Sequence, residues 1–545
     1  MRSPIAVTNR RRVLCVFPHY TPSFGTFSHA YKLMPGVRAF MPPQGLLLIA
    51  AYMPAEWPVR FIDENIAPAS DADFDWADVV VVSGMHIQAP QIRDIHRRAR
   101  AAGKVTVLGG PSASAAPEIY PEIEYLHIGE LGDATNRLIA TLDDNVAPPP
   151  AQVRFETKER VPLCDFPIPA YHLIPLSRYL MLTLQFSSGC PYVCEFCDIP
   201  GLYGRQPRLK TPQQITAELD AMRRQKDHPP VVYFVDDNFI GNRKATREML
   251  PHLIEWQKQH GYPMQFSCEA TLNIAKQTEI LALMRDAQFL GLFCGIETPE
   301  ADALKAMRKN QNNAVPMMDA IKTLNDHGLE VTSGIILGLD TDTPDTEARL
   351  KDFVDLSNVP MLTMNLLQAL PKTPLWDRLK RDGRIVDDPT LESNVRFLRP
   401  YDEVIAMWRR CIAHAYDPER LFARFAHQVD ATYGNRIIPP ASGKLTYANL
   451  KFAAIFMLRV IWYVGLRADY RRSFWRAAWR GLRRGQFDGV FGMAFIGHHL
   501  IEFSREALRG EQNASFYSWR TRQQRQRRRG PLGMTALAGS VRTPE

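Results

Sequence analysis

The sequence predicts an α/β protein with an N-terminal doubly wound parallel sheet, a central partial or full βα barrel and a C-terminal helical domain. Strand-like and helical runs alternate in two successive regions, which is typical of parallel sheets covered by helices. Beyond about residue 400 the strand-like runs give way to helical patterning. A chain of 545 residues is also too long for one core. We therefore expect domains at 1–150, 179–400 and 401–520, a connector at 151–178, and a basic disordered tail at 521–545.

Small residues follow the strands of the first region. This region alternates strand-like runs with helical ones, at 13–17, 45–52, 59–62, 79–82, 92–102, 105–108 and 125–128. In doubly wound sheets the carboxyl ends of the strands bind ligands. Short glycine loops at such ends are weakly specific, and a phosphate site for a nucleotide is one interpretation. The residues expected to contact a cofactor here are Ser83, Gly109, Gly110, Gly129 and Glu130.

Prolines mark the connector, at 148–150 and at positions 162, 167 and 169. The strand pattern then restarts. Six strand-like runs separated by helical stretches predict the barrel, whose functional groups are expected at the carboxyl ends of the strands. These runs span 182–186, 231–235, 264–267, 290–293, 331–337 and 362–370.

Three cysteines with CxxxCxxC spacing follow the first barrel strand: Cys190, Cys194 and Cys197. Thiolates are soft ligands that suit iron-sulfur clusters, and most 4Fe-4S clusters use four of them. Three on one loop leave one iron with an open site. A zinc knuckle is the alternative, but zinc normally takes a fourth Cys or His, and none follows at suitable spacing. With 8 cysteines in all, the chain is not a disulfide-stapled secreted protein, and a reducing cytoplasm is the expected compartment.

With Phe196 before the last cysteine, this segment resembles the radical S-adenosylmethionine (SAM) superfamily, over roughly residues 179–400. The resemblance implies a 4Fe-4S cluster on the three cysteines, with SAM chelated at the open iron and cleaved to a deoxyadenosyl radical. It also implies cofactor contacts at Asp236, Asp237 and Asn238, although the usual Gly-Gly-Glu is absent there. Helix capping by Asp237 and Asn238 is the alternative.

Glu269 and Glu297 also sit at predicted strand ends, and we expect them to contact a cofactor. Turn residues or surface carboxylates are the alternative interpretation. We assign no catalytic acid or base.

The first domain resembles the cobalamin-binding domain that precedes many radical SAM barrels. The Asp-x-His-x-x-Gly signature that supplies an axial histidine is absent, since the segment around His19 lacks its Asp and Gly. The resemblance therefore implies cobalamin whose cobalt has no ligand from that motif.

Two C-terminal stretches, 452–466 and 490–497, are apolar but shorter than the roughly 20 residues of a membrane span. Between them, 467–484 is rich in Arg and carries Trp475 and Trp479, a composition that suits a helix on an anionic lipid surface. An ordinary helical core with a solvated basic face is the alternative. We expect a cytoplasmic protein with peripheral contact to the inner face of the membrane, and no nucleic-acid partner.

Taken whole, including Met41 to Gly45 and the tryptophan-bearing helical extension, the chain is similar to the hopanoid C-2 methylase group of cobalamin-dependent radical enzymes. The resemblance implies a methyltransferase acting on an unactivated carbon of a polycyclic lipid, with an electron donor such as a flavodoxin or ferredoxin as partner. Alternatives are another cobalamin-dependent radical reaction, such as natural-product methylation or oxidative cyclisation, and a non-catalytic iron-sulfur protein.

Overall fold

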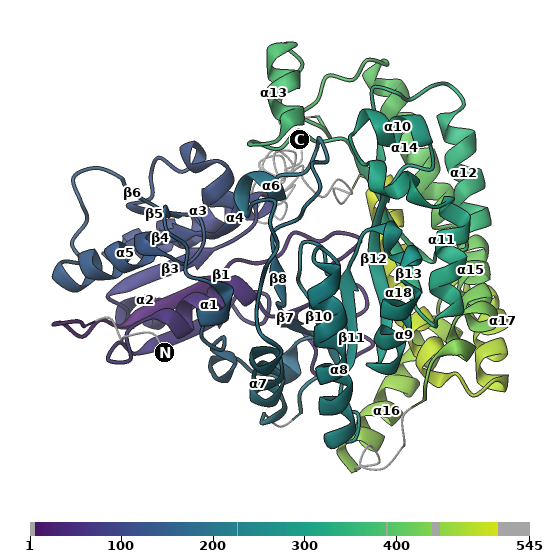
Figure 1. Ribbon diagram of the computed structural model, residues 1–545, viewed down its shortest axis with the longest axis horizontal. Coiled ribbons are helices and arrows are strands. Elements are labelled where there is room, and N and C mark those ends of the chain that lie inside the picture. Colours follow the sequence, from purple (N-terminus) through teal and green to yellow (C-terminus); the bar gives the residue numbers. More distant parts are fainter. Residues whose placement is uncertain (1–5, 226, 389–390, 439–446, 511–545) are drawn as a thin grey trace, which may run out of the picture.

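The computed structural model describes residues 6–225, 227–388, 391–438 and 447–510 (Figure 1), and the predicted tail at 521–545 lies outside these residues. The first sheet has six parallel strands in the order β2-β1-β3-β4-β5-β6, which confirms the predicted doubly wound sheet. Its strands are β1 Val13–Phe17, β2 Val59–Asp63, β3 Val79–Ser83, β4 Val105–Gly109, β5 Tyr125–Ile128 and β6 Val153–Glu156. β6 lies within the predicted connector, so the sheet continues past residue 150.

Both faces of this sheet are buried. On β1, Leu14 and Val16 pack in a core with Phe74 and Ile92, while Val13 on the other face belongs to the large core that continues into the barrel. Burial on both faces explains the unbroken apolar strands. The helices of this domain are α1 Gln44–Tyr52, α2 Asp71–Trp76, α3 Ala89–Ala101, α4 Gly110–Ala115, α5 Asp133–Asp144, η1 His86–Gln88 and η2 Pro117–Ile119.

The second sheet is a partial barrel of six parallel strands in the order β14-β13-β12-β11-β10-β7, open between its two end strands. The six predicted strand-like runs therefore all form strands. They are β7 Leu182–Leu184, β10 Val231–Phe234, β11 Gln265–Glu269, β12 Phe289–Glu297, β13 Glu330–Leu337 and β14 Met361–Leu366. A short antiparallel ribbon, β8 Ser187–Ser188 with β9 Arg208–Leu209, flanks the cysteine loop.

Helices cover the outside of the barrel, whereas α6 lies beside α4 and α13 lies beyond one end of the barrel (Figure 1). The helices of this domain are α6 Ile199–Leu202, α7 Pro212–Arg223, α8 Arg243–Gln259, α9 Thr278–Asp286, α10 Ala301–Ala306, α11 Met317–Asp326, α12 Thr346–Ser357 and α13 Pro374–Arg381, with the short helices η6 Leu272–Lys276 and η7 Asn310–Ala314.

The C-terminal unit is helical, as predicted, and covers the edge strand β14. The indole N–H of Trp408 donates to the Met364 carbonyl at 2.9 Å, and the Tyr416 hydroxyl donates to that of Leu362. Unpaired carbonyls on an edge strand are thereby satisfied by side chains. The helices are α14 Tyr401–Ala415, α15 Pro418–Ala431, α16 Tyr447–Val460, the π-helical turn η9 Ile461–Leu466, α17 Arg471–Arg483 and α18 Phe487–Leu508. Among the helices that the structure describes, none is both long and apolar enough to cross a bilayer.

The segment between β1 and α1 joins the first domain to these helices. The imidazole Nε2 of His499 lies 3.0 Å from the Ser23 carbonyl, and Phe24 stacks on Tyr416 with ring centroids 4.7 Å apart. Further along, Leu180 donates its backbone N–H to Ala39 just before β7. The three units thus form one packed body.

Candidate active site

The three predicted cluster ligands lie on one loop between β8 and α6. Gly189 opens the loop with a φ of +97°, and a Cβ there would lie 2.9 Å from the Gly204 carbonyl, so this position requires glycine. The backbone N–H of Cys190 donates to the same carbonyl at 3.2 Å. The loop is therefore fixed by its own backbone contacts.

Amide side chains from two other elements donate to the sulfurs. The Nδ2 of Asn238, which follows β10, lies 4.0 Å from the Cys190 sulfur. The Nε2 of Gln311 on η7 lies 3.3 Å from the Cys194 sulfur. Such hydrogen bonds stabilise thiolates and tune iron-sulfur clusters. The surroundings of the loop therefore suit charged sulfur.

Burial raises the pKa of Cys190, and it raises that of Cys197 strongly, with the neighbouring thiols adding to both shifts. Thiolates in this position therefore require a positive partner, which iron ions would supply. In the described part of the chain, no three His, Cys, Asp or Glu side chains are placed to hold a single metal ion. A zinc knuckle needs ligands that converge on one ion, whereas each cysteine of a cluster binds a different iron. The donor set fits a cluster better than zinc.

Lys309 adds a buried positive charge beside the loop. Its ammonium lies 2.5 Å from the Glu297 carboxylate and 5.5 Å from the centre of the Phe196 ring. Burial lowers the pKa of Lys309, but the charges of Glu297 and the thiols outweigh this effect and raise it. Glu297 itself ends β12 with a φ of +66°, and Lys309 holds its carboxylate. Lys309 and Gln311 both come from the segment after α10, where the sequence carries no motif.

The three polar residues after β10 have different surroundings. Asp236 is buried and accepts the backbone N–H groups of Phe186 and Ser187, so it fastens β10 to the start of the cysteine loop. Asp237 accepts the N–H of Gly189 at 2.7 Å. Burial raises the pKa of Asp236 to about 7 and that of Asp237 to about 6. Both hold the loop rather than cap α8, whose capping side chain is Asn242.

Glu269 ends β11 and faces the interior of the barrel. Its side chain is accessible to water. The surrounding protein atoms nevertheless desolvate the carboxylate, and this effect raises its pKa to about 7. The Tyr233 hydroxyl lies 3.4 Å from the carboxylate. Of the predicted carboxylates, Glu269 is the one most open to a ligand in the barrel.

The strand ends of the first sheet bring backbone loops close together. Gly110 has a φ of +85°, and a Cβ there would lie 2.3 Å from the Ser83 hydroxyl. Gly129 has a φ of +100° and donates its N–H to Ser114 at 2.9 Å. The strand order reverses between β1 and β3, beside Ser83, and such switch points form ligand crevices. Gly109, the last residue of β4, lies next to Ser83 in register.

Glu130 instead joins the two domains. Its carboxylate accepts the Ser188 hydroxyl at 3.0 Å and the Arg208 guanidinium at 2.5 Å, and Arg160 lies 3.3 Å away. Protein groups therefore contact both oxygens, and Glu130 joins the first domain to the start of the cysteine loop.

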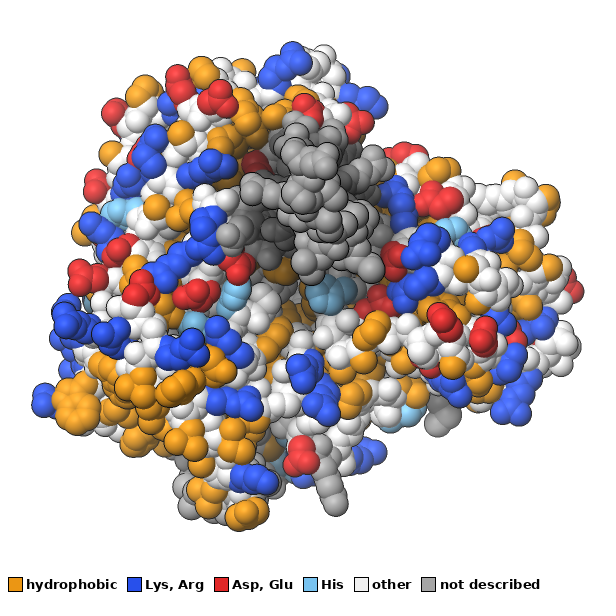
Figure 2. All heavy atoms as spheres, turned by 180° about the vertical axis from the view of Figure 1, so that it is seen from behind, with side chains coloured by type: hydrophobic (Ala, Val, Ile, Leu, Met, Phe, Trp, Pro, Cys, Tyr) orange, Lys and Arg blue, Asp and Glu red, His pale blue; other side chains and the backbone are white. Residues whose placement is uncertain are grey.

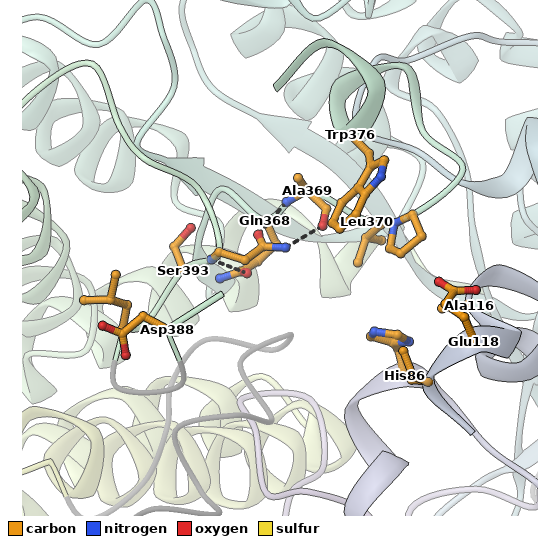
Figure 3. A pocket seen from close by; sticks show the side chains of 13 residues that line it. His86, Ala116, Glu118, Gln368, Ala369, Leu370, Trp376, Asp388 and Ser393 are labelled. Carbon is orange, nitrogen blue, oxygen red and sulfur yellow. Dashed lines mark hydrogen bonds between the residues drawn. The ribbon is translucent and has the colours of Figure 1, made fainter. Parts of the chain in front are cut away.

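A cavity of about 90 Å³ lies between the two sets of strand ends. Figure 3 shows His86 and Glu118 of the first domain opposite Gln368, Leu370 and Trp376 of the barrel side. The Lys372 ammonium crosses this boundary to the Ser114 carbonyl. The carboxyl edges of both sheets therefore face each other, which brings a ligand on one sheet close to a ligand on the other.

The chain is similar in sequence and in fold to known proteins. Residues 184–354 match the family model of the Radical SAM superfamily, and residues 373–513 match the Domain of unknown function (DUF4070). The chain is 56% identical to the hopanoid C-2 methylase of Rhodopseudomonas palustris (strain TIE-1), over 94% of this chain and 97% of that protein.

Two solved folds are similar at 15% identity each. The radical SAM methyltransferase TsrM from Kitasatospora setae, solved with cobalamin and a [4Fe-4S] cluster, has a TM-score of 0.57 and covers 92% of this chain and 100% of its own. The cobalamin-dependent SAM radical enzyme OxsB, solved with aqua-cobalamin and SAM, has a TM-score of 0.56 and covers 95% of this chain and 83% of its own.

The cysteine loop at the mouth of a partial barrel, together with the superfamily match, defines a radical SAM protein that carries a doubly wound domain at its N-terminus. Within that class, the chain belongs to the hopanoid C-2 methylase family.

Proposed function

We propose that this protein is a cobalamin-dependent radical SAM methyltransferase that methylates the C-2 position of a hopanoid. The observation that carries the proposal is the 56% identity to hopanoid C-2 methylase over nearly the whole of both chains. The geometry agrees with it, since the first domain and the barrel contribute side chains to one cavity, and Glu130 at a strand end of the first sheet contacts Ser188 at the start of the cysteine loop.

The residues present fit the cofactors that this activity needs. Cys190, Cys194 and Cys197 would hold the cluster, and the enclosed interior near Glu269 would hold SAM. Ser83, Gly109, Gly110 and Gly129 would admit cobalamin, because glycines let the backbone approach a large flat ligand. When bound, these groups supply one-electron cleavage of SAM and a transferable methyl group, which is chemistry that side chains alone lack.

The chain's own residues bind and shield these groups. Gln311 and Asn238 donate to the cysteine sulfurs, and Lys309 adds a buried positive charge that is paired with Glu297. With the cofactors bound, the facing strand ends would shield the space between them from bulk water, which would protect reactive species from side reactions. We also propose that a flavodoxin or ferredoxin reduces the cluster, and that the protein acts at the cytoplasmic face of the membrane.

Complementation of a deletion strain tests the proposal. In a hopanoid-producing bacterium that lacks its own C-2 methylase, the wild-type chain should restore 2-methylhopanoids, measured by mass spectrometry of total lipids. Cys194→Ala should restore none, because one ligand of the cluster is lost. Cys164→Ala is the matched control, since Cys164 is exposed and lies outside the loop.

An unchanged lipid profile in the complemented strain, with folded protein present, would contradict the hopanoid substrate. Iron content and the visible absorbance of the anaerobically purified chain test the cofactor separately. If Cys194→Ala binds as much iron as wild type and still cleaves SAM, the radical mechanism fails as well.

A further inference from the structure

An exposed apolar stripe runs along α16 and η9. Leu450, Leu458, Trp462 and Leu466 are spaced by four or eight residues, so they lie on one face of this continuous helical segment. Leu458 is 66% exposed and Trp462 is 52% exposed. Apolar side chains normally turn inward on a surface helix, so within the described part of the chain this face lacks the partner that its composition predicts.

The opposite side of the same segment already has a partner. Phe456, Val460 and Val464, again four residues apart, are buried in the main core. The segment is therefore apolar on two sides, and among the residues that the structure describes, packing uses one of them. Figure 2 shows the other side as a band of hydrophobic side chains at the lower left, over α16, η9 and α17, with Lys and Arg side chains beside it.

Positive charge surrounds the stripe. Residues 447–487 contain nine Lys or Arg and one acidic residue, Asp469. That carboxylate is paired with Arg505 at 2.7 Å. Exposed arginines include Arg467, Arg472 and Arg476. An apolar stripe with a cationic border is complementary to an anionic lipid bilayer. The acyl chains of the lipids would contact the stripe, and the negative headgroups would contact the basic border.

Exposed aromatic rings are paired with these cations. The Arg467 guanidinium lies 5.9 Å from the centre of the Trp462 ring, and Arg483 lies 5.3 Å from that of Trp479. Trp and Arg side by side suit the bilayer interface, where the ring enters the headgroup region and the charge stays wet. Trp475 differs, because its indole N–H donates to the Gly465 carbonyl at 2.9 Å and its partly buried ring packs against the core.

We infer that α16, η9 and the exposed side of α17 form a docking surface for an anionic lipid bilayer. A second copy of this chain is the less favourable occupant, because a two-fold interface would place both cationic borders against each other.

The surface also contacts the segment that leads from the ligand-binding edge of the first sheet. The Lys32 ammonium lies 5.4 Å from the Tyr463 ring, and Arg459 donates to the Lys32 carbonyl. Docking would therefore place the bilayer beside that segment.

This inference deepens the proposed function, but its test needs no turnover. Full-length protein is sedimented with vesicles of phosphatidylcholine alone or of phosphatidylcholine with phosphatidylglycerol, both free of hopanoids. Wild type should bind the anionic vesicles strongly and the neutral ones weakly. Because each basic residue near the surface contributes an approximately fivefold gain in affinity, Arg472→Glu with Arg476→Glu should lower anionic binding by at least roughly tenfold. Leu458→Glu with Trp462→Glu should lower binding to both.

Matched controls are Leu356→Glu, at an equally exposed leucine on α12, and Arg243→Glu, at the exposed start of α8. Both should bind vesicles like wild type, and circular dichroism should show that all variants fold. Failure of wild type to bind anionic vesicles would overturn the inference. Wild-type binding by the Leu458→Glu, Trp462→Glu stripe variant would also overturn it, as would binding that depends only on residues after Gly510. A dimer that the stripe variants convert to monomer, with vesicle binding unchanged, would assign the stripe to a second copy instead. A failed hopanoid assay leaves this result untouched.

Discussion

Gln311 donates to the Cys194 sulfur of the cysteine loop and has no other role in the proposed function. Hydrogen bonds to cluster sulfurs favour the reduced state, which carries more negative charge. Gln311→Leu should therefore lower the midpoint potential of the cluster while iron content stays at the wild-type level. Redox titration followed by electron paramagnetic resonance measures this change.

Asn313→Leu is the matched control, because Asn313 lies on the same short helix but is exposed and bonds to the Ala301 carbonyl. Its potential should equal that of wild type. An unchanged potential in Gln311→Leu would mean that the contact with Cys194 has no electrostatic role.

The sequence predicts the sulfur ligands but not their neighbours. Cys190, Cys194 and Cys197 form a local motif, and their spacing carries the chemistry. Gln311 is 117 residues from Cys194 in the chain and belongs to no pattern. Glu130 was predicted to contact a cofactor because it follows a strand. Its ion partners, Arg160 after β6 and Arg208 on β9, are distant in the sequence, so no local pattern predicts these contacts.

At the scale of elements, α18 holds the segment after β1 through a neutral histidine. His499 Nδ1 lies 3.4 Å from the backbone N–H of His29, and Nε2 lies 3.0 Å from the Ser23 carbonyl. The neutral ring satisfies both contacts, with Nδ1 accepting and Nε2 donating. Protonation of Nδ1 would place its N–H against the backbone N–H of His29, so that two donors would face each other. Burial lowers the pKa of His499 to about 3.

The free energy of unfolding should therefore fall as the pH drops from about 6.5 toward 3, because only the unfolded chain binds the proton in that range. At pH 5.5 the loss from His499 is about 1 kcal/mol relative to neutral pH. Denaturant midpoints at both pH values measure it. His499→Gln, which offers one acceptor and one donor, should remove this part of the pH dependence. An equally steep dependence in His499→Gln would assign it to other groups.

Apolar runs predict most elements well, since parallel strands are buried on both faces. The same reasoning missed β6, because prolines before and after it mark the region as a connector. β6 is an edge strand of four residues, with one half-buried valine and one buried phenylalanine. Short edge strands carry little hydrophobic signal, so their pairing depends on the rest of the sheet.

For the whole molecule, Glu130 is the charge that joins the first sheet to the cysteine loop. Glu130→Gln would leave Arg208 partly buried without its carboxylate. We expect a loss of about 1 to 2 kcal/mol in unfolding free energy and faster hydrogen exchange in residues 187–190. Glu122→Gln breaks an exposed pair with Arg93 and should change stability by less than about 0.5 kcal/mol. Equal effects of the two substitutions would contradict the interdomain role.

The contact between His499 and the segment after β1 also constrains the order of biosynthesis. Ser23 and His29 leave the ribosome first, and their partner on α18 follows 470 or more residues later. At 5–20 residues per second, the segment waits roughly 25 to 95 s for α18. During that interval Phe24 and Phe27, both buried in the finished protein, have no α18 to pack against. We therefore expect these two rings to be incompletely packed until α18 has been synthesised, and a ribosome-bound chaperone to bind the segment during that interval.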